Sequence, residues 1–240
     1  MKPILIIKTG HTLQSAFEKA GDFERWIIES MQAKADEFSV VSVYKDEKLP
    51  QHDAVAGAVI TGSPAMVTDR LPWSEYAADW LRHAVVTRMP ILGICYGHQL
   101  LAHALGGQVD YHPKGREIGT TQVKLLEEAR QDALFADSEL EFAAHVSHMQ
   151  SVVRLPAGAK VLGKNDFEDF HAVQFAELVW GLQFHPEFNE IIMRAYVEER
   201  QQALRDEGLD VDKIFAAIQA TPAASKLMVS FYKLIKNYSV

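Results

Sequence analysis

The sequence predicts an α/β fold: a mostly parallel, doubly wound, flavodoxin-like sheet with helices on both faces, an additional small antiparallel sheet and a C-terminal helical extension. Up to Gly107, short apolar runs alternate with amphipathic segments at helical spacing, which is the pattern of βαβ units. Beyond Gly107, short strand-like runs follow one another with few helices between them, as in an antiparallel edge or a second small sheet. The last segment, 189–240, has a helical pattern with charges on its outer face.

The first part contains four expected strands and three expected helices. Strands covered on both faces by helices read as continuous apolar runs, and such runs occur four times. We expect strands at Ile4–Lys8, Phe38–Tyr44, Gly57–Thr61 and Pro90–Ile94. We expect helices at Asp22–Ala35, with Asp22 as its N-cap, at Ser74–Val86, and at Gln99–Leu105, which Gly106 and Gly107 close.

The second part is expected to add short strands and then three helices. The strands are Thr120–Leu126, Glu141–Ser147, Lys160–Gly163, Ala172–Ala176 and Leu178–Phe184. The helices start near Asn189, near Asp210 and after Pro222, where Thr221 is the expected cap and a first-turn proline is tolerated. We expect residues 1–188 to form one domain and residues 189–240 to be a helical extension packed on that same domain.

Composition excludes several classes of function. A net charge of -8 without a basic run argues against a nucleic-acid partner, which needs a concentrated positive surface. No apolar stretch approaches the roughly 18 residues of a membrane span, and the N-terminus lacks a signal-peptide pattern. We therefore expect a cytoplasmic protein with neither a nucleic-acid nor a membrane partner.

Cys95 is the single cysteine, so an internal disulfide and a cysteine-rich zinc site are both excluded. A lone cysteine is often only a small buried apolar residue, so its neighbours decide its role. It lies in Gly93-Ile94-Cys95-Tyr96-Gly97, between an apolar strand and a helix, which is the pattern of a strand-to-helix nucleophile elbow. Side chains at the two glycines would collide within such a turn, and the following helix favours a thiolate.

A cysteine nucleophile needs a base, and His185 is the best candidate among ten histidines. It follows an expected strand, so it lies at the same kind of strand end as Cys95. Glu187, two residues further on, can meet the outer imidazole nitrogen and fix its tautomer. The alternative is that His185 and Glu187 only close a surface turn.

Two segments, Gly93–Gln99 (GICYGHQ) and Trp180–Glu187 (WGLQFHPE), strongly resemble the class I, or triad-type, glutamine amidotransferases. Ile60–Pro64 (ITGSP) is similar to that family's glycine-rich oxyanion loop, and Val146–Met149 (VSHM) to its substrate-holding segment. The resemblance extends over roughly Met1 to Glu187. It points to a stand-alone member, similar to the glutaminase domain of GMP synthase or to γ-glutamyl peptidases.

The resemblance implies a role for each matching residue. Cys95, His185 and Glu187 would form the catalytic triad that cleaves the γ-glutamyl amide of glutamine through a thioester, releasing ammonia. The backbone N–H groups of Ser63 and Tyr96 would form the oxyanion hole. Substrate would be bound by Gly62, Gln99, Ser147, His148 and Met149. No cofactor and no metal are implied.

Two departures from the family pattern bear on these roles. Gly62-Ser63-Pro64 replaces the usual Gly-Gly-Pro, and Ser63 keeps its backbone donor if the turn accommodates a β-carbon. Met149-Gln150 stands where the nucleotide-synthesising relatives carry Gly-Asp, which bears on the ammonia acceptor more than on glutamine hydrolysis. The sequence also lacks a phosphate-binding G-x-x-x-x-G-K-[ST] loop. Ammonia would therefore pass to a separate synthetase subunit or be released to water.

Other interpretations stay open. A γ-glutamyl peptidase is the alternative enzyme, and a catalytically silent binding or regulatory protein is the alternative of another class. His98 and His103 are five residues apart rather than four, which disfavours a helical metal pair. His11 is expected to be a loop residue near the site. The C-terminal helices would form a homodimer contact or a lid.

Overall fold

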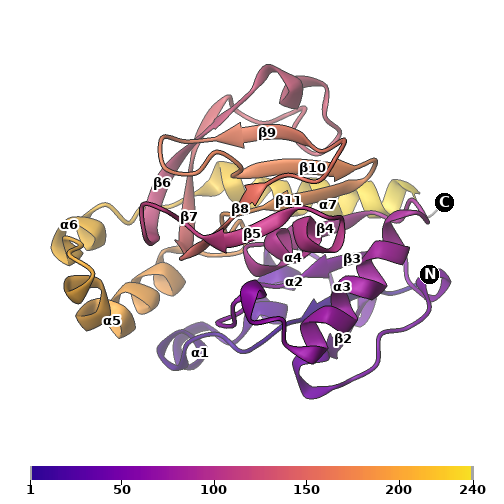
Figure 1. Ribbon diagram of the computed structural model, residues 1–240, viewed down its shortest axis with the longest axis horizontal. Helices are drawn as coiled ribbons and strands as arrows, with labels where there is room; N and C mark the ends of the chain where they lie inside the picture. The colour runs from indigo at the N-terminus through magenta and orange to yellow at the C-terminus, as the bar shows by residue number, and fades with distance from the viewer. Residues whose placement is uncertain (1, 239–240) are drawn as a thin grey trace.

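The computed structural model describes residues 2–238. Its main sheet has nine strands in the order β2-β1-β3-β4-β11-β10-β9-β6-β7, and a separate two-stranded sheet pairs β5 with β8 (Figure 1). The strands are β1 Ile4–Lys8, β2 Phe38–Ser42, β3 Gly57–Ile60, β4 Ile91–Ile94, β5 Gln108–Tyr111, β6 Glu117–Leu125, β7 Glu141–His148, β8 Gln150–Arg154, β9 Lys160–Lys164, β10 Ala172–Ala176 and β11 Val179–Leu182.

The main sheet is parallel in one half and antiparallel in the other. Strands β2, β1, β3, β4 and β11 pair in parallel, and the strands from β10 to β7 pair antiparallel. Both expectations for the second part of the chain are therefore met, since antiparallel strands extend the main sheet and a small second sheet exists. β11 joins the halves, pairing with β4 on one side and β10 on the other.

Helices cover both faces of the parallel half, as predicted. In β1, Ile4 and Ile6 face a core shared with α2 and α7, whereas Leu5 and Ile7 face α3 and α4, because successive strand side chains point to opposite faces. The helices are α1 Gln14–Ala20, α2 Phe23–Ser30, α3 Pro72–Val85, α4 Tyr96–Ala104, α5 Glu190–Asp206, α6 Val211–Ala216 and α7 Pro222–Tyr238.

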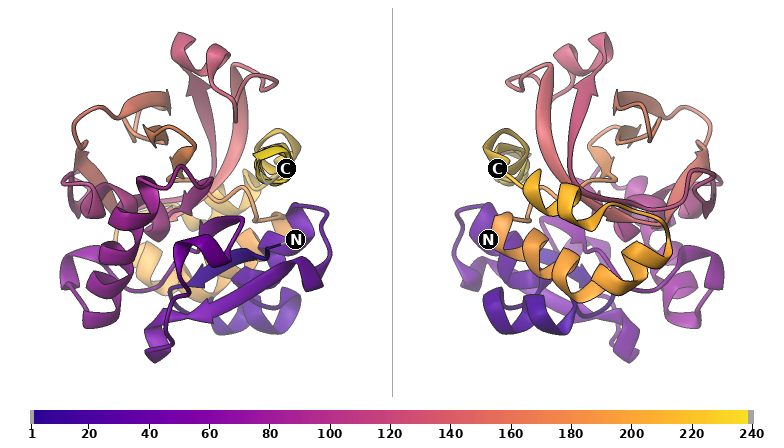
Figure 2. Two further views of the ribbon diagram at one scale, coloured as in Figure 1. Left: turned by 90° about the vertical axis from the view of Figure 1, so that its right-hand side faces the viewer. Right: turned by 90° about the vertical axis from the view of Figure 1, so that its left-hand side faces the viewer.

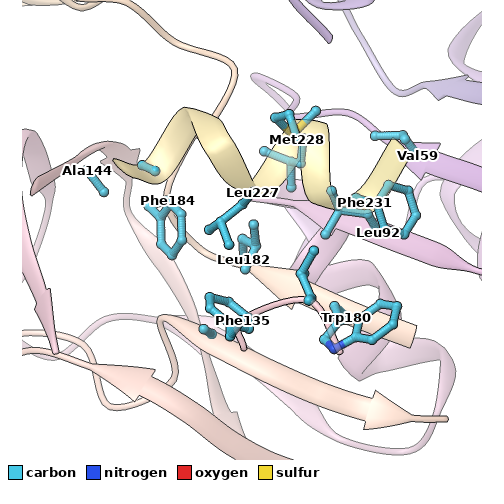
Figure 3. Close-up of a cluster of buried hydrophobic side chains, with 14 of the residues drawn as sticks. Val59, Leu92, Phe135, Ala144, Trp180, Leu182, Phe184, Leu227, Met228 and Phe231 are labelled. Carbon is cyan, nitrogen blue, oxygen red and sulfur yellow. The ribbon is translucent and has the colours of Figure 1, made fainter. Parts of the chain in front are cut away.

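The last helix is part of the core. Leu227, Met228 and Phe231 of α7 lie against Leu182 and Trp180 of β11 (Figure 3), and the three helix residues are at most 1% exposed. A third cluster joins α1, α5 and α6, which lie at one end of the molecule (Figures 1 and 2). No helix among residues 2–238 combines the length and hydropathy needed to cross a membrane.

Several elements differ from the sequence-based expectation. Helix α1 and strands β5 and β8 were not expected, because each is short and gains its apolar partners from elsewhere in the chain. Helix α2 ends at Ser30 rather than Ala35, since Gln32 adopts a left-handed φ of 54°. Helix α4 begins at Tyr96, three residues earlier than expected, so that Cys95 directly precedes its first turn.

Candidate active site

Cys95 lies in a strained turn between β4 and α4. Its φ of 50° and ψ of -99° fall where side chains are disfavoured, and its N–H donates to the Leu182 carbonyl at 2.7 Å. A Cβ on Gly93 would lie 2.4 Å from the Gly97 oxygen, and one on Gly97 would lie 2.5 Å from the Ile60 oxygen. These contacts explain both glycines of the motif, because only glycine lets α4 pass so close to β3 and β4.

Both the backbone and the ring of His185 are held by neighbouring groups. Its N–H donates to the His145 carbonyl at 2.8 Å, and its ring stacks on Phe188 with centroids 4.0 Å apart. Nδ1 lies 2.8 Å from Glu187 Oε1, and the side chains of His185 and Glu187 are 3% and 0% exposed. With Nδ1 bound to Glu187, Nε2 is the ring nitrogen left for the Cys95 thiol, and His185 and Cys95 line the same small cavity.

This environment favours the protonated imidazole. Burial by itself lowers the pKa of His185, but the Glu187 carboxylate and the Cys95 sulfur outweigh it and raise that pKa to about 10. Cys95 is 7% exposed and lines two small cavities, so the sulfur can be reached from outside the core. The structure thus brings Cys95, His185 and Glu187 together at the carboxyl ends of the parallel strands β4 and β11.

The residues expected to form the oxyanion hole lie beside the sulfur. Within residues 2–238, neither the Ser63 nor the Tyr96 backbone N–H has a protein acceptor, and both residues line a cavity with Cys95. The Ser63 hydroxyl donates to the Thr9 carbonyl at 2.7 Å and accepts from the Ala65 N–H at 3.1 Å. Ser63 does not have a positive φ, so the turn accommodates its β-carbon. A Cβ on Gly62 would lie 3.0 Å from His185 Cε1, so a larger residue there would press on the imidazole ring.

Of the five residues expected to bind substrate, four line a cavity at Cys95 and one does not. The Gln99 amide nitrogen is directed into the protein, donating to the Gln150 carbonyl at 2.7 Å and to Gln183 Oε1 at 2.9 Å. The Ser147 carbonyl lies 3.8 Å from the Cys95 sulfur, which donates to it. Gln99, Ser147, His148 and Met149 all line the cavity at Cys95, whereas Gly62 lies against the His185 ring.

The His148 side chain, besides lining the cavity, is part of a buried polar cluster. Its Nε2 lies 2.9 Å from Glu117, which also receives Asn165 Nδ2 at 2.7 Å and has His171 Nε2 at 3.3 Å. Burial opposes ionisation of Glu117, but the hydrogen bond from His148 and the nearby His171 ring hold its pKa well below the usual range. Among the described residues, no group of three His, Cys, Asp or Glu side chains is arranged to hold a metal ion.

Two cavities adjoin the sulfur. The larger, about 70 Å³, contains the segment Ser147–Gln150 and Gln99, and the smaller, about 30 Å³, contains His185, His11 and Tyr196. His11 is a loop residue that also bonds to Asp22 at 2.6 Å and to the Tyr44 hydroxyl at 2.7 Å.

Sequence reasoning missed two residues of this site, Arg116 and Arg200. Arg116 lines the larger cavity, and Arg200 lines both. Neither stands in a recognisable motif, because each is a single arginine brought to the site by the packing of a loop or of α5. No local pattern in the sequence could have assigned them.

Comparisons with known proteins identify the family of this chain. The family model for glutamine amidotransferase class-I matches residues 18–199. A glutamine-hydrolysing GMP synthase from Thermosipho africanus is 33% identical over 150 residues, which is 60% of this chain and 27% of the relative. The chain thus spans about a quarter of that relative's length. One subunit of a glutamine-hydrolysing GMP synthase from Methanocaldococcus jannaschii is 32% identical over 142 residues, 59% of this chain and 69% of the relative.

Solved structures show the same fold over nearly the full length. A glutamine amidotransferase from Thermotoga maritima has a TM-score of 0.78 at 19% identity and covers 98% of each chain. A glutamine amido transferase from Methylobacillus flagellatus has a TM-score of 0.71 at 22% identity, covering 99% of this chain and 95% of its own. The match of the family model over most of the sequence, on a fold of this kind, shows that the chain belongs to the class-I glutamine amidotransferase family.

Proposed function

We propose that this protein hydrolyses the side-chain amide of glutamine with Cys95 as nucleophile, His185 as acid and base, and Glu187 as the group that orients His185. The observation that carries the proposal is the buried Cys95–His185–Glu187 array, in which a 2.8 Å contact joins His185 Nδ1 to the Glu187 carboxylate and the His185 ring lines the same cavity as Cys95. A raised imidazole pKa beside a thiol favours the thiolate–imidazolium pair, which is the reactive form.

The reaction proceeds in two balanced steps. The Cys95 thiolate adds to the amide carbon, and when the tetrahedral intermediate collapses, the carbon–nitrogen bond breaks as His185 donates its Nε2 proton to the departing ammonia. His185 then removes a proton from water, the resulting hydroxide adds to the thioester, and glutamate leaves as the sulfur departs. Backbone N–H groups of Ser63 and Tyr96 stabilise both oxyanions, each contributing about 3–4 kcal/mol in comparable hydrolases.

The fate of ammonia separates two forms of this function. The relatives are named as glutamine-hydrolysing GMP synthases, and one of them is a single subunit of such an enzyme, which supports transfer to a separate synthetase subunit. Met149-Gln150, where nucleotide-synthesising relatives carry Gly-Asp, favours a different acceptor or water, and with it the γ-glutamyl peptidase alternative. A co-purifying ATP-dependent protein would support the first form, and faster turnover of γ-glutamyl peptides than of glutamine would support the second.

The test is ammonia release from glutamine by the wild type, Cys95→Ala and His185→Ala. Both variants are expected to lose at least about a thousandfold in kcat, because members of such a triad act as a unit. His83→Ala is the matched control, since its side chain is 64% exposed on α3 and it should keep full activity. If the wild type turns over neither glutamine nor any γ-glutamyl dipeptide, the hydrolase proposal fails and the silent binding protein takes its place.

A further inference from the structure

Arg200 is a partly buried cation whose neighbouring carboxylates are engaged elsewhere. It lies on α5, its Nε is buried, and within residues 2–238 it has neither a hydrogen-bond nor an ion-pair partner. The adjacent Glu199 carboxylate accepts from the Ser15 N–H at 2.8 Å, and Glu207 pairs with Arg116. A guanidinium donor left unpaired in a protein wall is costly, so it points to an acceptor supplied by a ligand.

The wall around Arg200 is positively charged where it faces the sulfur. Arg200 lines both cavities at Cys95, Arg116 lines the larger one, and neither cavity has an Asp or Glu in its described lining. Arg116 is partly neutralised, since its Nε and Nη2 contact the Glu207 carboxylate at 2.8 and 2.9 Å. Arg200 has no such neutralising contact. In a protein of net charge -8, such a wall selects for an anionic group on the substrate.

The position of the two arginines indicates which anionic group they meet. The leaving nitrogen must lie beside His185, which lines the smaller cavity but not the larger. Arg116 lines only the larger cavity, which also contains Gln99 and Ser147–Gln150, whereas Arg200 lines both cavities. A γ-glutamyl unit whose carbonyl carbon is at the sulfur therefore extends its amino-acid end toward the arginines.

We propose that Arg200, supported by Arg116, binds the α-carboxylate of the γ-glutamyl unit and so restricts the enzyme to substrates that carry a free one. The inference rests on the proposed function, because it uses the position of the leaving group to orient the substrate. Planar guanidinium groups suit carboxylates through paired N–H donors. The helical segment after residue 188 then supplies a substrate-binding residue as well as core packing.

The kinetic test compares glutamine with its α-amide analogue, in which the α-carboxylate is a neutral carboxamide. The wild type should prefer glutamine by about ten- to a hundredfold in kcat/KM, which is the effect expected from a hydrogen bond to a charged group. Arg200→Gln should lose about the same factor on glutamine, mainly through KM, and should no longer distinguish the two substrates. Arg205→Gln on the exposed side of the same helix is the control and should behave like the wild type. Unchanged discrimination in Arg200→Gln overturns the proposal.

A second pair of substrates tests the orientation. γ-Glutamylglycine and γ-glutamylmethylamide differ only in a carboxylate on the leaving group, so Arg200→Gln should reduce both rates equally. If Arg200→Gln removes a preference between these two and leaves the α-amide discrimination intact, the α-carboxylate assignment is wrong. If Arg200→Gln does not fold, as judged by circular dichroism, the same substrates are compared with Arg200→Lys and the wild type instead. A wild type that does not prefer glutamine over its α-amide overturns the proposal.

Binding to the inactive Cys95→Ala protein separates this inference from the proposed function. By calorimetry, Cys95→Ala should bind glutamine at least about tenfold more tightly than the α-amide, and adding Arg200→Gln should remove that difference. If this holds while the wild type releases no ammonia, the carboxylate site stands and the hydrolase proposal fails. If the wild type is active but binding does not depend on Arg200, the carboxylate site fails and the hydrolase proposal stands.

Discussion

At the scale of one residue, the backbone strain at Cys95 lowers the stability of the folded protein. A side chain held at φ 50° and ψ -99° costs about 1–3 kcal/mol, and the surrounding β4–α4 turn leaves no other conformation. Glycine occupies such a conformation without strain, although it is usually less stabilising than alanine. We therefore expect the free energy of unfolding of Cys95→Gly to equal that of Cys95→Ala or to exceed it by up to about 1 kcal/mol. Urea unfolding of the two inactive variants measures this, and a clearly more stable Cys95→Ala would contradict the strain.

Glu187 controls the protonation of His185. Its removal as Glu187→Gln should lower the pKa of His185 from about 10, because the carboxylate is a principal cause that raises it. In the proposed mechanism His185 must be protonated to release ammonia, so the basic limb of the kcat/KM profile should move to lower pH. The rate at neutral pH should also fall, on the order of 10²–10⁴-fold, as when a triad carboxylate is replaced by an amide.

Kinetics from about pH 5 to 10 test the role of Glu187, with the exposed Glu190→Gln as the control. The acid limb should report the cysteine–histidine pair. A basic limb that stays in place after Glu187→Gln would show that Glu187 does not set the charge of the ring. A profile flat across this range in the wild type would count against the whole mechanism.

At the scale of elements, Glu117 ties the antiparallel strands together beneath the site. It begins β6 and accepts from His148 at the end of β7 and from Asn165 after β9. Because folding lowers its pKa, its ionised form contributes stability at pH values above the unfolded pKa of about 4.5, and this contribution is lost as the pH falls further. Glu117→Gln should cost about 1–3 kcal/mol near neutral pH and less near pH 3.5. Urea unfolding at both pH values checks this, and Glu141→Gln at an exposed position of β7 should show neither effect.

At the scale of the whole molecule, α7 completes the core beneath β11. Phe231 is fully buried and meets Trp180 edge to face, with ring centroids 6.2 Å apart (Figure 3). Phe231→Ala should lower the free energy of unfolding by about 3–5 kcal/mol, since it removes a large buried ring and leaves a cavity. Phe17→Ala, at a side chain 49% exposed on α1, should change it far less. Chemical denaturation measures the free energy of unfolding of both variants. Equal losses of that free energy would show that α7 packs only weakly.

The buried face of α7 also changes how the predicted homodimer should be tested. Deleting residues 221–240 would remove core side chains such as Leu227 and Phe231, so loss of folding would mask any change in assembly. Light scattering of the intact chain at several concentrations gives the oligomeric state directly. The homodimer and the cytoplasmic location both stay predictions.

The sequence by itself determined the family, the fold class and the elbow around Cys95, because each depends on local patterns: apolar strands, helical spacing and glycines at a tight turn. The same patterns placed Cys95 and His185 at strand ends, and β4 and β11 are indeed parallel neighbours. Only the tertiary structure decided the pairing of β5 with β8, the inward direction of the Gln99 amide and the presence of Arg116 and Arg200 beside the sulfur. These features depend on contacts between segments far apart in the chain, and a contact of that kind leaves no local signature in the residues that make it.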